Sequence, residues 1–383
     1  MIRFLPKPGV LLIILILVSS ACSTESPGET ELRMVFLGDI MAHDVNYNMR
    51  GYDRIYEHVL PLFTEAEFVF GQLEFVVDPD RPQSSYPRFN VHPAYVVAAV
   101  EAGIRVFSLA NNHSTDFGEA GMRATGTSMQ TIAREHDIWF NGLRSDADDE
   151  DYANDRFEIT VLPHAGLRIG FLALTRLLND SSAGNAVHYV PRGNADAAGA
   201  FMESLSHLTQ GFDVFVLSVH DGIEYLQDVD GETLSFMTAA ADAGADIVWG
   251  NHPHVLQQWF LHERTGAGPA LIMPSLGNFV SGQTWPLGPD RAEAAWAATG
   301  DSAVVRVIMR GTAAGVAIER VVADLVTHYK DPGGGVSVRP LDGLAGHAVL
   351  SDEWREFYRI RAERNSHFDL LHERARDQAN TRE

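Results

Sequence analysis

The sequence predicts an α/β fold in which most of the strands run parallel. Short apolar, β-rich runs alternate with helical stretches along the chain, and a polar cluster follows several of the apolar runs at once. Two helix–strand units resemble each other closely: VEAGIRVFSLANNH at 100–113 and ADAGADIVWGNHPH at 241–254. Repeated units of this kind are typical of a parallel sheet that is covered by helices.

The expected elements begin with Met34–Leu37, an apolar run typical of a buried strand. Residues 93–102 are predicted as a helix that ends at Gly103. Residues 78–93, rich in Pro and Ser, and the acidic stretch 145–155 are expected to be surface loops. The other expected elements are strands at 104–109, 167–174, 214–219 and 247–249, a helix at 233–243 that ends at Gly244, antiparallel strands at 303–309 and 316–326, and an amphipathic helix at 354–376.

Composition limits the chemistry of the chain. It has 383 residues, of which 45% are hydrophobic, enough for a large core. Cys22 is the only cysteine, so an internal disulfide is excluded and a metal in the folded domain must be bound by nitrogen and oxygen donors. The formal net charge of -22 argues against nucleic acid as a partner. The negative charge would also repel a polyanionic substrate unless bound cations reverse the electrostatic field near the site.

The first 21 residues have the pattern of a secretory signal peptide. Arg3 and Lys7 precede an apolar run at 10–18 that is too short to span a membrane, and small residues lead to Cys22. A cysteine in this place resembles the lipobox of bacterial lipoproteins, although Ser19 stands where Leu is usual. We therefore expect lipidation at Cys22, a linker at 22–31, and an extracytoplasmic protein anchored to the membrane. Secretion with an incidental cysteine is the alternative.

Side chains that can bind metals follow the ends of six apolar runs. They are Asp39 after MVFLG, Glu74 after FVFGQL, Asn112 and His113 after VFSLAN, His220 after VFVLSV, His252 and His254 after IVWGN, and Asn278 after LIMPSLG. Because the carboxyl ends of parallel strands meet at one edge of a sheet, residues 200 positions apart are expected to converge there. Such a set of carboxylates, amides and imidazoles suits Mn, Fe or Zn, often as a pair of ions.

Each of these residues also has a purely structural interpretation when it is taken alone. Asp39 is in a position to cap a helix, Glu74 to be an edge carboxylate, and His220 to be a neutral core histidine. His252-Pro-His254 is different, because two imidazoles on a turn with a rigid proline have no evident packing purpose. The prediction of a metal site therefore depends on the whole set and most of all on this turn.

The motifs that carry these residues resemble a known family. They are LGDIM at 37–41, GQLE at 71–74, SLANNHSTDFGEAGM at 108–122, VHDGIEY at 219–225, GADIVWGNHPHVLQ at 244–257 and SLGNF at 275–279. In this order and spacing they resemble the CapA family, the capsule-synthesis and poly-γ-glutamate branch of the calcineurin-like metallophosphatase superfamily. The resemblance covers roughly residues 33–285, and the motifs at 108–122 and 244–257 are the most specific.

The resemblance implies a four-layer α/β/β/α metallophosphatase-like sandwich with a dinuclear metal site. Asp39 and His254 would then bind one ion, Glu74 would bridge the two ions, and Asn112, His220 and His252 would bind the second. His113 would protonate the leaving oxygen or clamp the transition state. Asp116 would orient His113, and Glu224 and Asn278 would support the ligands.

Three positions depart from the pattern of the superfamily. Its first motif is Asp-x-His, whereas residue 41 is Met, and His43 substitutes only if the loop bends. The usual Asn-Leu-Glu begins here with Gln72, which leaves the carboxylate in place. The usual His-Trp-Gly has Asp221 at its centre, so we expect an added charge beside the site.

Two functions follow from the resemblance and remain open at this point. One is a cell-envelope phosphatase or esterase that acts on an anionic polymer or a phosphoester in capsule or poly-γ-glutamate synthesis or export. The other is a non-catalytic export or assembly component, in complex with other capsule-synthesis subunits, whose metal site binds polymer carboxylates. Fold alone does not separate them. In either case the expected domain spans 32–330, and a helical extension follows at 331–383.

Overall fold

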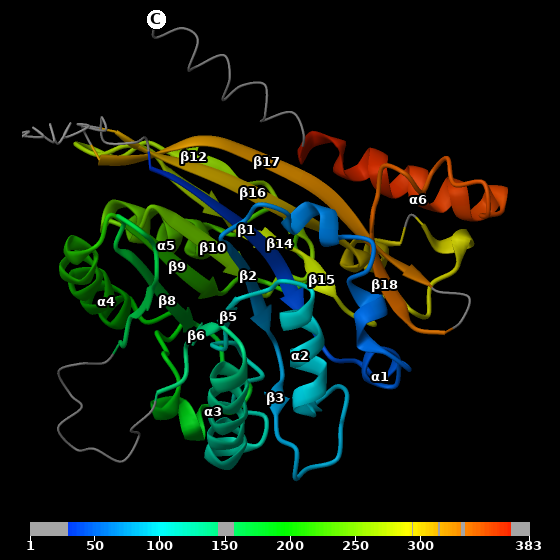
Figure 1. Ribbon diagram of the computed structural model, residues 1–383, viewed down its shortest axis with the longest axis horizontal. Coiled ribbons are helices and arrows are strands. Elements are labelled where there is room, and N and C mark those ends of the chain that lie inside the picture. Colours follow the sequence, from blue (N-terminus) through cyan, green and yellow to red (C-terminus); the bar gives the residue numbers. More distant parts are fainter. Residues whose placement is uncertain (1–29, 145–156, 293, 313–314, 331–333, 369–383) are drawn as a thin grey trace, which may run out of the picture.

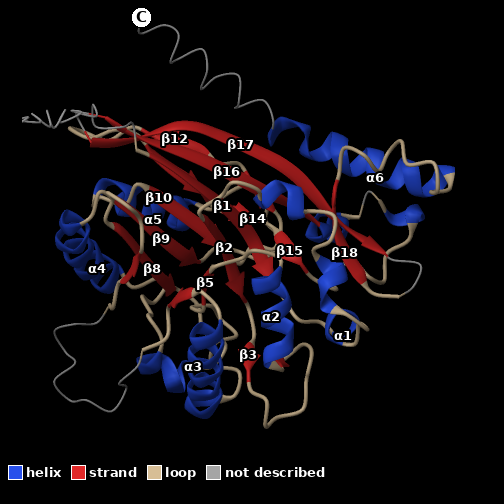
Figure 2. Ribbon diagram, in the orientation of Figure 1, coloured by secondary structure: helices blue, strands red, loops and turns tan. Residues whose placement is uncertain are grey.

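The computed structural model describes residues 30–144, 157–292, 294–312, 315–330 and 334–368. In these residues two large β-sheets form the centre of the molecule and helices surround them (Figures 1 and 2). Cys22, the expected signal peptide and the expected acidic loop at 145–155 lie outside the described residues. Among the described helices, none combines the length and the apolar character needed to cross a membrane.

The larger sheet contains eight strands in the described residues. Its parallel part comprises β1 (Glu31–Ile40), β2 (Phe68–Leu73), β5 (Val106–Ser108), β6 (Trp139–Asn141) and the short β15 (Asn278–Val280), which pairs with the end of β1. Its antiparallel part comprises β16 (Asp301–Thr312), β17 (Gly315–Lys330) and β18 (Val336–Pro340).

The smaller sheet has the order β12-β13-β10-β9-β8-β7. Its strands are β7 (Thr160–Leu162), β8 (Ile169–Thr175), β9 (Val214–His220), β10 (Ile247–Asn251), β12 (Phe260–His262) and β13 (Ala270–Met273). The four central strands are parallel, and the two edge strands are antiparallel. Two short pairs lie outside these sheets: β3 (Val76–Val77) with β4 (Asn90–Val91), and β11 (Leu256–Gln257) with β14 (Ser275–Leu276).

The alternation of side chains along the strands explains why the two sheets pack face to face. In β1, Met34 and Phe36 belong to the core between the sheets, whereas Val35 and Leu37 belong to the core on the outer face. Aromatic rings fill the inner core, and the Phe36 ring lies 5.8 Å from that of Trp249 in β10. The indole N–H of Trp249 also donates to the Leu37 carbonyl oxygen at 2.9 Å, which ties one sheet to the other.

Helices cover both outer faces. On the larger sheet the outer core is formed with α2 (Pro93–Glu101) and α3 (Gly118–Glu135), and on the smaller sheet with α4 (Ala195–Leu208) and α5 (Gly231–Asp242). The short α1 (Asp44–Tyr47) follows β1, and α6 (Asp352–Asn365) packs Phe357 and Tyr358 into the core between the sheets. The predicted four-layer α/β/β/α sandwich is therefore confirmed.

Two expectations about the chain differ from the structure. The larger sheet continues past residue 330, because β18 pairs with β17, so the expected domain boundary falls inside the sheet. The expected surface loop at 78–93 contains β4 and a fully buried Phe89. Its backbone turns inward because the side-chain amide of Asn90 donates to three carbonyl oxygens of the loop, those of Asp78, Arg81 and Pro82.

His188 gives the fold a predictable dependence on pH. Its Nδ1–H donates to the Ala173 carbonyl oxygen in β8, Nε2 accepts the Glu158 N–H, and burial lowers its pKa to about 4. As pH falls from about 6.5 to about 4, the unfolded chain gains a proton at this residue that the folded chain refuses. The free energy of unfolding should therefore decrease by up to about 3 kcal/mol from this group alone.

Urea denaturation at pH 7 and pH 4.5 tests this expectation. His188→Gln should lose less stability between the two pH values than the wild type does. His207→Gln, an exposed change on α4, is the matched control and should behave like the wild type. Equal losses in all three proteins would contradict the assignment to His188.

Candidate metal centre

The polar site is a continuation of the inner core at the carboxyl ends of the strands. In β9 the side chains of Val214 and Val216 face the other sheet, so Ser218 and His220 lie on the same face two and four residues further on. Ser218 donates to Ser108 at the end of β5 at 3.0 Å, across the two sheets. Beyond this contact the inner face changes from apolar to polar, and the two sheets position functional side chains against each other.

Glu74 lies at the centre of this site. It follows β2, and its side chain is completely buried. Neither of its carboxylate oxygens accepts a hydrogen bond within the described residues, and Oε1 lies 3.6 Å from His254 Nε2, the distance of a long ion pair. A buried carboxylate without hydrogen-bond donors is costly, and such a group is usually paired closely with a cation or bound to a metal.

The turn that carries His252 and His254 is held in a strained conformation. His252 has φ 105° and His254 has φ 59°, in the left-handed region that residues other than glycine rarely adopt. The structure fixes the turn from two sides: the Tyr225 N–H donates to the Pro253 carbonyl oxygen at 2.8 Å, and Asp39 Oδ2 lies 3.1 Å from His254 Nδ1. Backbone strain of this kind costs of the order of 1–3 kcal/mol per residue and concentrates at functional sites.

His220 and Asn112 meet across the two sheets. The Asn112 Oδ1 atom lies 2.9 Å from His220 Nε2, and the side-chain amide of Gln72 contacts His220 Nδ1. The His220 ring also lies 4.8 Å from the His252 ring. All four side chains are buried or nearly so, so water is largely excluded from this part of the site.

The structure thus brings together the residues that the sequence predicts as metal ligands. Two groups have ligand atoms within 4.8 Å of one another: Glu74 with His252 and His254, and Asp39 with Glu74 and His220. Glu74 belongs to both groups. His252 lies in the group with His254 and His220 in the group with Asp39, and the expected division of the ligands between two ions, with Glu74 as the bridge, stays a prediction.

The charges in the cluster favour an added cation. Burial, together with the nearby carboxylates of Asp39 and Glu224, raises the pKa of Glu74 well above its usual range. Burial lowers the pKa of His254, but Glu74 and Asp39 more than reverse this effect and raise it to about 9. Burial and the neighbouring histidines hold the pKa values of His220 and His252 well below their usual range. These two rings are therefore neutral at pH 7, the form that binds metals.

These observations fit a divalent metal. The Glu74 oxygens and the Nδ1 atom of His252 have no hydrogen-bond partner within the described residues and are ligand atoms available to an ion. The nitrogen and oxygen donor set is the one that Mn, Fe and Zn accept. The residues present therefore suit one or two such ions.

His113 and Asp116 lie beside the ligands. Asp116 Oδ2 lies 2.8 Å from His113 Nδ1 and also accepts the Phe89 N–H at 2.8 Å. The Phe89 ring meets the His113 ring edge-on at 4.7 Å. The contact expected between His113 and Asp116 is present, and it leaves His113 Nε2 as the nitrogen available for a proton transfer.

Position 41 supplies no ligand. The Met41 side chain packs into the outer core, away from the cluster. His43 lies nearby, but its Nδ1 accepts the Gly282 N–H at 3.1 Å and its ring packs edge-on against Phe89. Neither residue belongs to either ligand group of the described residues. The histidine that the superfamily has at position 41 is therefore not replaced as a ligand by Met41 or His43.

The expected extra charge of Asp221 is compensated. Its buried carboxylate accepts from Arg176 Nη1 at 2.8 Å and from Arg192 Nη1 at 2.7 Å. Arg176 also pairs with Glu232 at 2.9 Å. Asp221 is therefore part of an ion-pair network behind His220 rather than a free charge beside the ligands.

Sequence reasoning missed one residue of the site and gave two others a smaller role than the structure does. Gln72 was named only as a departure from the family motif, yet its side-chain amide contacts His220, and its place two positions before Glu74 could have indicated this. Asn278 was expected only as a supporting residue, and its Oδ1 lies 2.9 Å from His254 Nδ1. Asn179, whose Oδ1 accepts from Asn112 Nδ2 at 3.2 Å, had no signal because it lies in an irregular loop.

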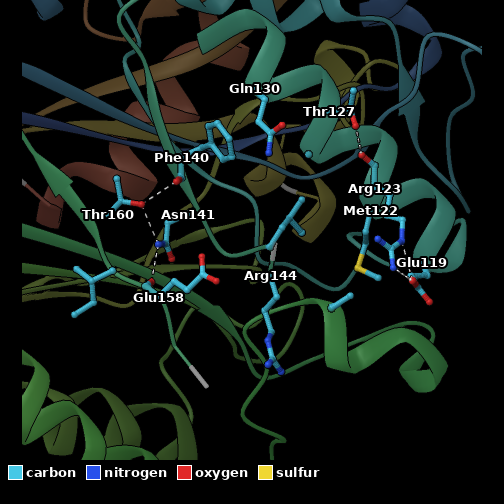
Figure 3. A pocket seen from close by; sticks show the side chains of 14 residues that line it. Glu119, Met122, Arg123, Thr127, Gln130, Phe140, Asn141, Arg144, Glu158 and Thr160 are labelled. Atoms are coloured by element: carbon cyan, nitrogen blue, oxygen red, sulfur yellow. Dashed lines mark hydrogen bonds and ion pairs between the residues drawn. The ribbon is translucent and has the colours of Figure 1, made fainter. Parts of the chain in front are cut away.

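A separate cavity of about 450 Å³ lies between α3 and the β6–β7 region (Figure 3). Arg123 of α3 pairs with Glu119 on its wall, and Arg144 and Glu158 line it as well. None of the expected metal ligands lines this cavity. Both acidic and basic side chains line it, so the cavity does not resemble the metal centre.

Comparison with known proteins places these motifs in one family. The model of the bacterial capsule synthesis protein PGA_cap matches residues 33–283. The capsule biosynthesis protein CapA of Bacillus anthracis is 29% identical over 276 residues, which cover 68% of this chain and 62% of that protein. The PGA biosynthesis protein CapA of Bacillus subtilis (strain 168) is 29% identical over 270 residues, covering 67% and 65%. The chain thus spans less than two thirds of either relative.

Solved structures with a related arrangement are distant. The calcineurin-like phosphoesterase YfkN from Bacillus subtilis is 10% identical, with a TM-score of 0.42, over 78% of this chain and 91% of that one. The 5′-nucleotidase from Candida albicans SC5314 is 10% identical, with a TM-score of 0.43, over 88% and 57%. These values carry no argument about activity, which has to be built on the residues of the site.

Proposed function

The chain belongs to the bacterial capsule synthesis protein family PGA_cap, and on that premise we propose that it is a metal-dependent hydrolase of a phosphoester in the synthesis or export of a capsule polymer. The observation that carries this proposal is Glu74, a buried carboxylate whose oxygens accept no hydrogen bond within the described residues and whose ion-pair contact at 3.6 Å is with His254, itself an expected ligand. A structural carboxylate at this depth would be hydrogen-bonded.

Six side chains would hold the metal in this proposal. Glu74 would bridge, and Asp39, Asn112, His220, His252 and His254 would complete the set, with Mn, Fe or Zn as one or two ions. The bound metal would neutralise the charge of the phosphoester and supply a nucleophile from water. The fixed positions of the strand ends hold these donors in place before substrate arrives.

The protein's own proton transfer would come from His113. The Asp116 carboxylate accepts the Nδ1–H of His113 and fixes the ring, while Phe89 restricts its rotation. Nε2 would then deliver a proton to the leaving oxygen as the ester bond breaks. The buried surroundings of both residues limit competing exchange of that proton with water.

The location is part of the same proposal. Lipidation at Cys22 would attach the protein to the membrane on the outer side. The substrate would be an anionic polymer or a phosphoester that the capsule machinery presents, and other capsule-synthesis proteins would be partners.

Metal content and turnover test the proposal together. We expect the purified protein to bind one or two divalent ions and to hydrolyse a generic phosphodiester when Mn²⁺ is added. His220→Ala and His252→Ala should lower both the metal content and the rate, whereas the exposed His207→Ala should change neither. Bound metal without turnover on any ester would favour the non-catalytic role, in which the metal binds polymer carboxylates. Absence of bound metal would refute both roles.

A further inference from the structure

The mouth of the metal centre carries exposed aromatic and aliphatic side chains. Among the described residues, the exposed large hydrophobic side chains include Ile223 and Leu226 on the loop after β9 and Trp296 on the segment after β15. Both segments follow strands whose ends form the site, and Trp296 contacts Tyr225, which lies between Ile223 and Leu226 in the chain. Exposed apolar side chains beside a site indicate a binding surface.

Tyr225 connects this surface to the metal ligands. Its φ of 65° is left-handed, like those of His252 and His254. Its N–H donates to the Pro253 carbonyl oxygen, and its ring lies 6.2 Å from the His254 ring. Gly222 lets the two turns approach, since a Cβ there would lie 2.9 Å from Pro253 Cγ. Tyr225 is therefore held against the strained turn that carries the ligands.

Trp296 completes an angled aromatic pair with Tyr225. The two ring centroids are 4.9 Å apart, with 46° between the ring planes. The indole N–H donates to the Gln283 carbonyl oxygen at 2.7 Å, which fixes the ring, yet 42% of Trp296 is exposed. The two rings contact each other, so no ligand ring fits between them, and a ligand would lie on their exposed faces. Because these faces are tilted against each other, they form an open platform that suits the C–H face of a puckered ring better than a flat ring that stacks on a single plane.

The polar groups next to the pair suit hydroxyl groups. Glu224 is exposed and hydrogen-bonds with the Tyr225 hydroxyl, and the Gln283 side-chain amide is 3.5 Å from that hydroxyl. Neither residue is cationic, and the chain as a whole carries a net charge of -22. An anionic ring would be repelled here, whereas an uncharged ring with hydroxyl groups would find both acceptors and donors.

We propose that Tyr225 and Trp296 form a subsite for an uncharged sugar ring beside the metal centre. The inference rests on the proposed function, because the sugar would be the alcohol side of the phosphoester that the metal centre hydrolyses. The platform would hold that ring while the ester group reaches Glu74 and the histidines. Tyr225 and Trp296 would thus select the substrate without taking part in the bond cleavage.

Binding of free saccharides tests the subsite independently of hydrolysis. The probes are maltohexaose and methyl α-D-glucopyranoside, with adenosine as a flat comparison, each titrated against the intact chain by tryptophan fluorescence and ligand-observed NMR. We expect saturable binding of maltohexaose. Trp296→Ala should weaken this binding about tenfold, and Tyr225→Phe should weaken it less because the ring is retained.

Trp285→Ala is the matched control. Trp285 is 36% exposed, close to the value for Trp296, but it is not part of the pair. This variant should bind maltohexaose as the wild type does. Preference for adenosine, an equal loss in Trp285→Ala, or no binding of any probe would overturn the subsite. Turnover of a phosphodiester without saccharide binding would refute the subsite alone, and saccharide binding without turnover or metal would refute the proposed function alone.

Discussion

Glu74→Gln should abolish the stabilisation of the protein by divalent metal. A ligand at 100 times its Kd stabilises a folded protein by about 2.7 kcal/mol. We expect Mn²⁺ to raise the thermal midpoint of the wild type in this way and to have no effect on the variant. The reason is that Glu74 supplies ligand atoms to both groups and its oxygens accept no hydrogen bond within the described residues, whereas glutamine replaces one of these oxygens with an NH₂ group that does not bind a cation.

The same variant should not be less stable than the wild type when a chelator is present. Burial makes the ionised form of Glu74 costly, and glutamine has the same shape without the charge. The variant keeps Asp39, which lies 3.1 Å from His254 Nδ1, as the carboxylate partner of that ring. Glu119→Gln, which removes an exposed carboxylate from α3, is the control and should keep the response to Mn²⁺. A full response to Mn²⁺ in Glu74→Gln would contradict the central role of Glu74. A loss of stability in the metal-free variant would instead make Glu74 a structural residue.

The parts of the fold that the sequence could predict are those with a strict side-chain period. β8, β9 and β10 are continuous apolar runs because both of their faces are buried, and they were predicted within a few residues. The ends of two helices were predicted because glycine commonly terminates a helix, here at Gly103 and Gly244. In the structure both glycines have φ near 110°, where a helix cannot continue. β18 was not predicted, since it is short and follows a glycine-rich stretch that is typical of a loop.

The residues of the candidate site also fall into those that the sequence could predict and those that it could not. Asp39 and His220 lie at the carboxyl ends of β1 and β9, and Glu74 and the 252–254 turn come directly after β2 and β10. Parallel strands bring their carboxyl ends to one edge. Their convergence therefore followed from local patterns. The pairing of Asp221 with Arg176 and Arg192 did not, because it joins irregular segments whose course depends on tertiary packing.

Phe89 and Tyr225 show the same limit. Both lie in segments without a periodic pattern, and the backbone N–H of each donates to a distant segment, to the Asp116 carboxylate and to the Pro253 carbonyl oxygen respectively. No spacing in the sequence predicts such contacts. Residues that surround the metal ligands, such as Phe89 and Tyr225, are thus harder to predict from the sequence than the ligands themselves.

His113→Ala should lower kcat by about 10²- to 10⁴-fold for a phosphodiester with a poor leaving group, while the metal content stays unchanged. His113 belongs to neither ligand group of the described residues, so its loss should not release metal. Asp116→Asn should have a smaller effect, because the Phe89 ring still restricts the imidazole. Stopped-flow or steady-state kinetics with a metal analysis of each variant provides the measurement, and His207→Ala is the control.

The leaving group separates the two roles that His113 can have. If Nε2 protonates the leaving oxygen, the variant should lose far less activity on a p-nitrophenyl diester than on the phenyl diester, because p-nitrophenolate departs without a proton. If His113 only clamps the charge of the transition state, the two losses should be similar, since that charge is present with either leaving group. The geometry favours the acid, because Asp116 occupies Nδ1 and leaves Nε2 as the free nitrogen. Similar losses on both esters would therefore contradict the role assigned to His113 and leave the metal ligands unaffected.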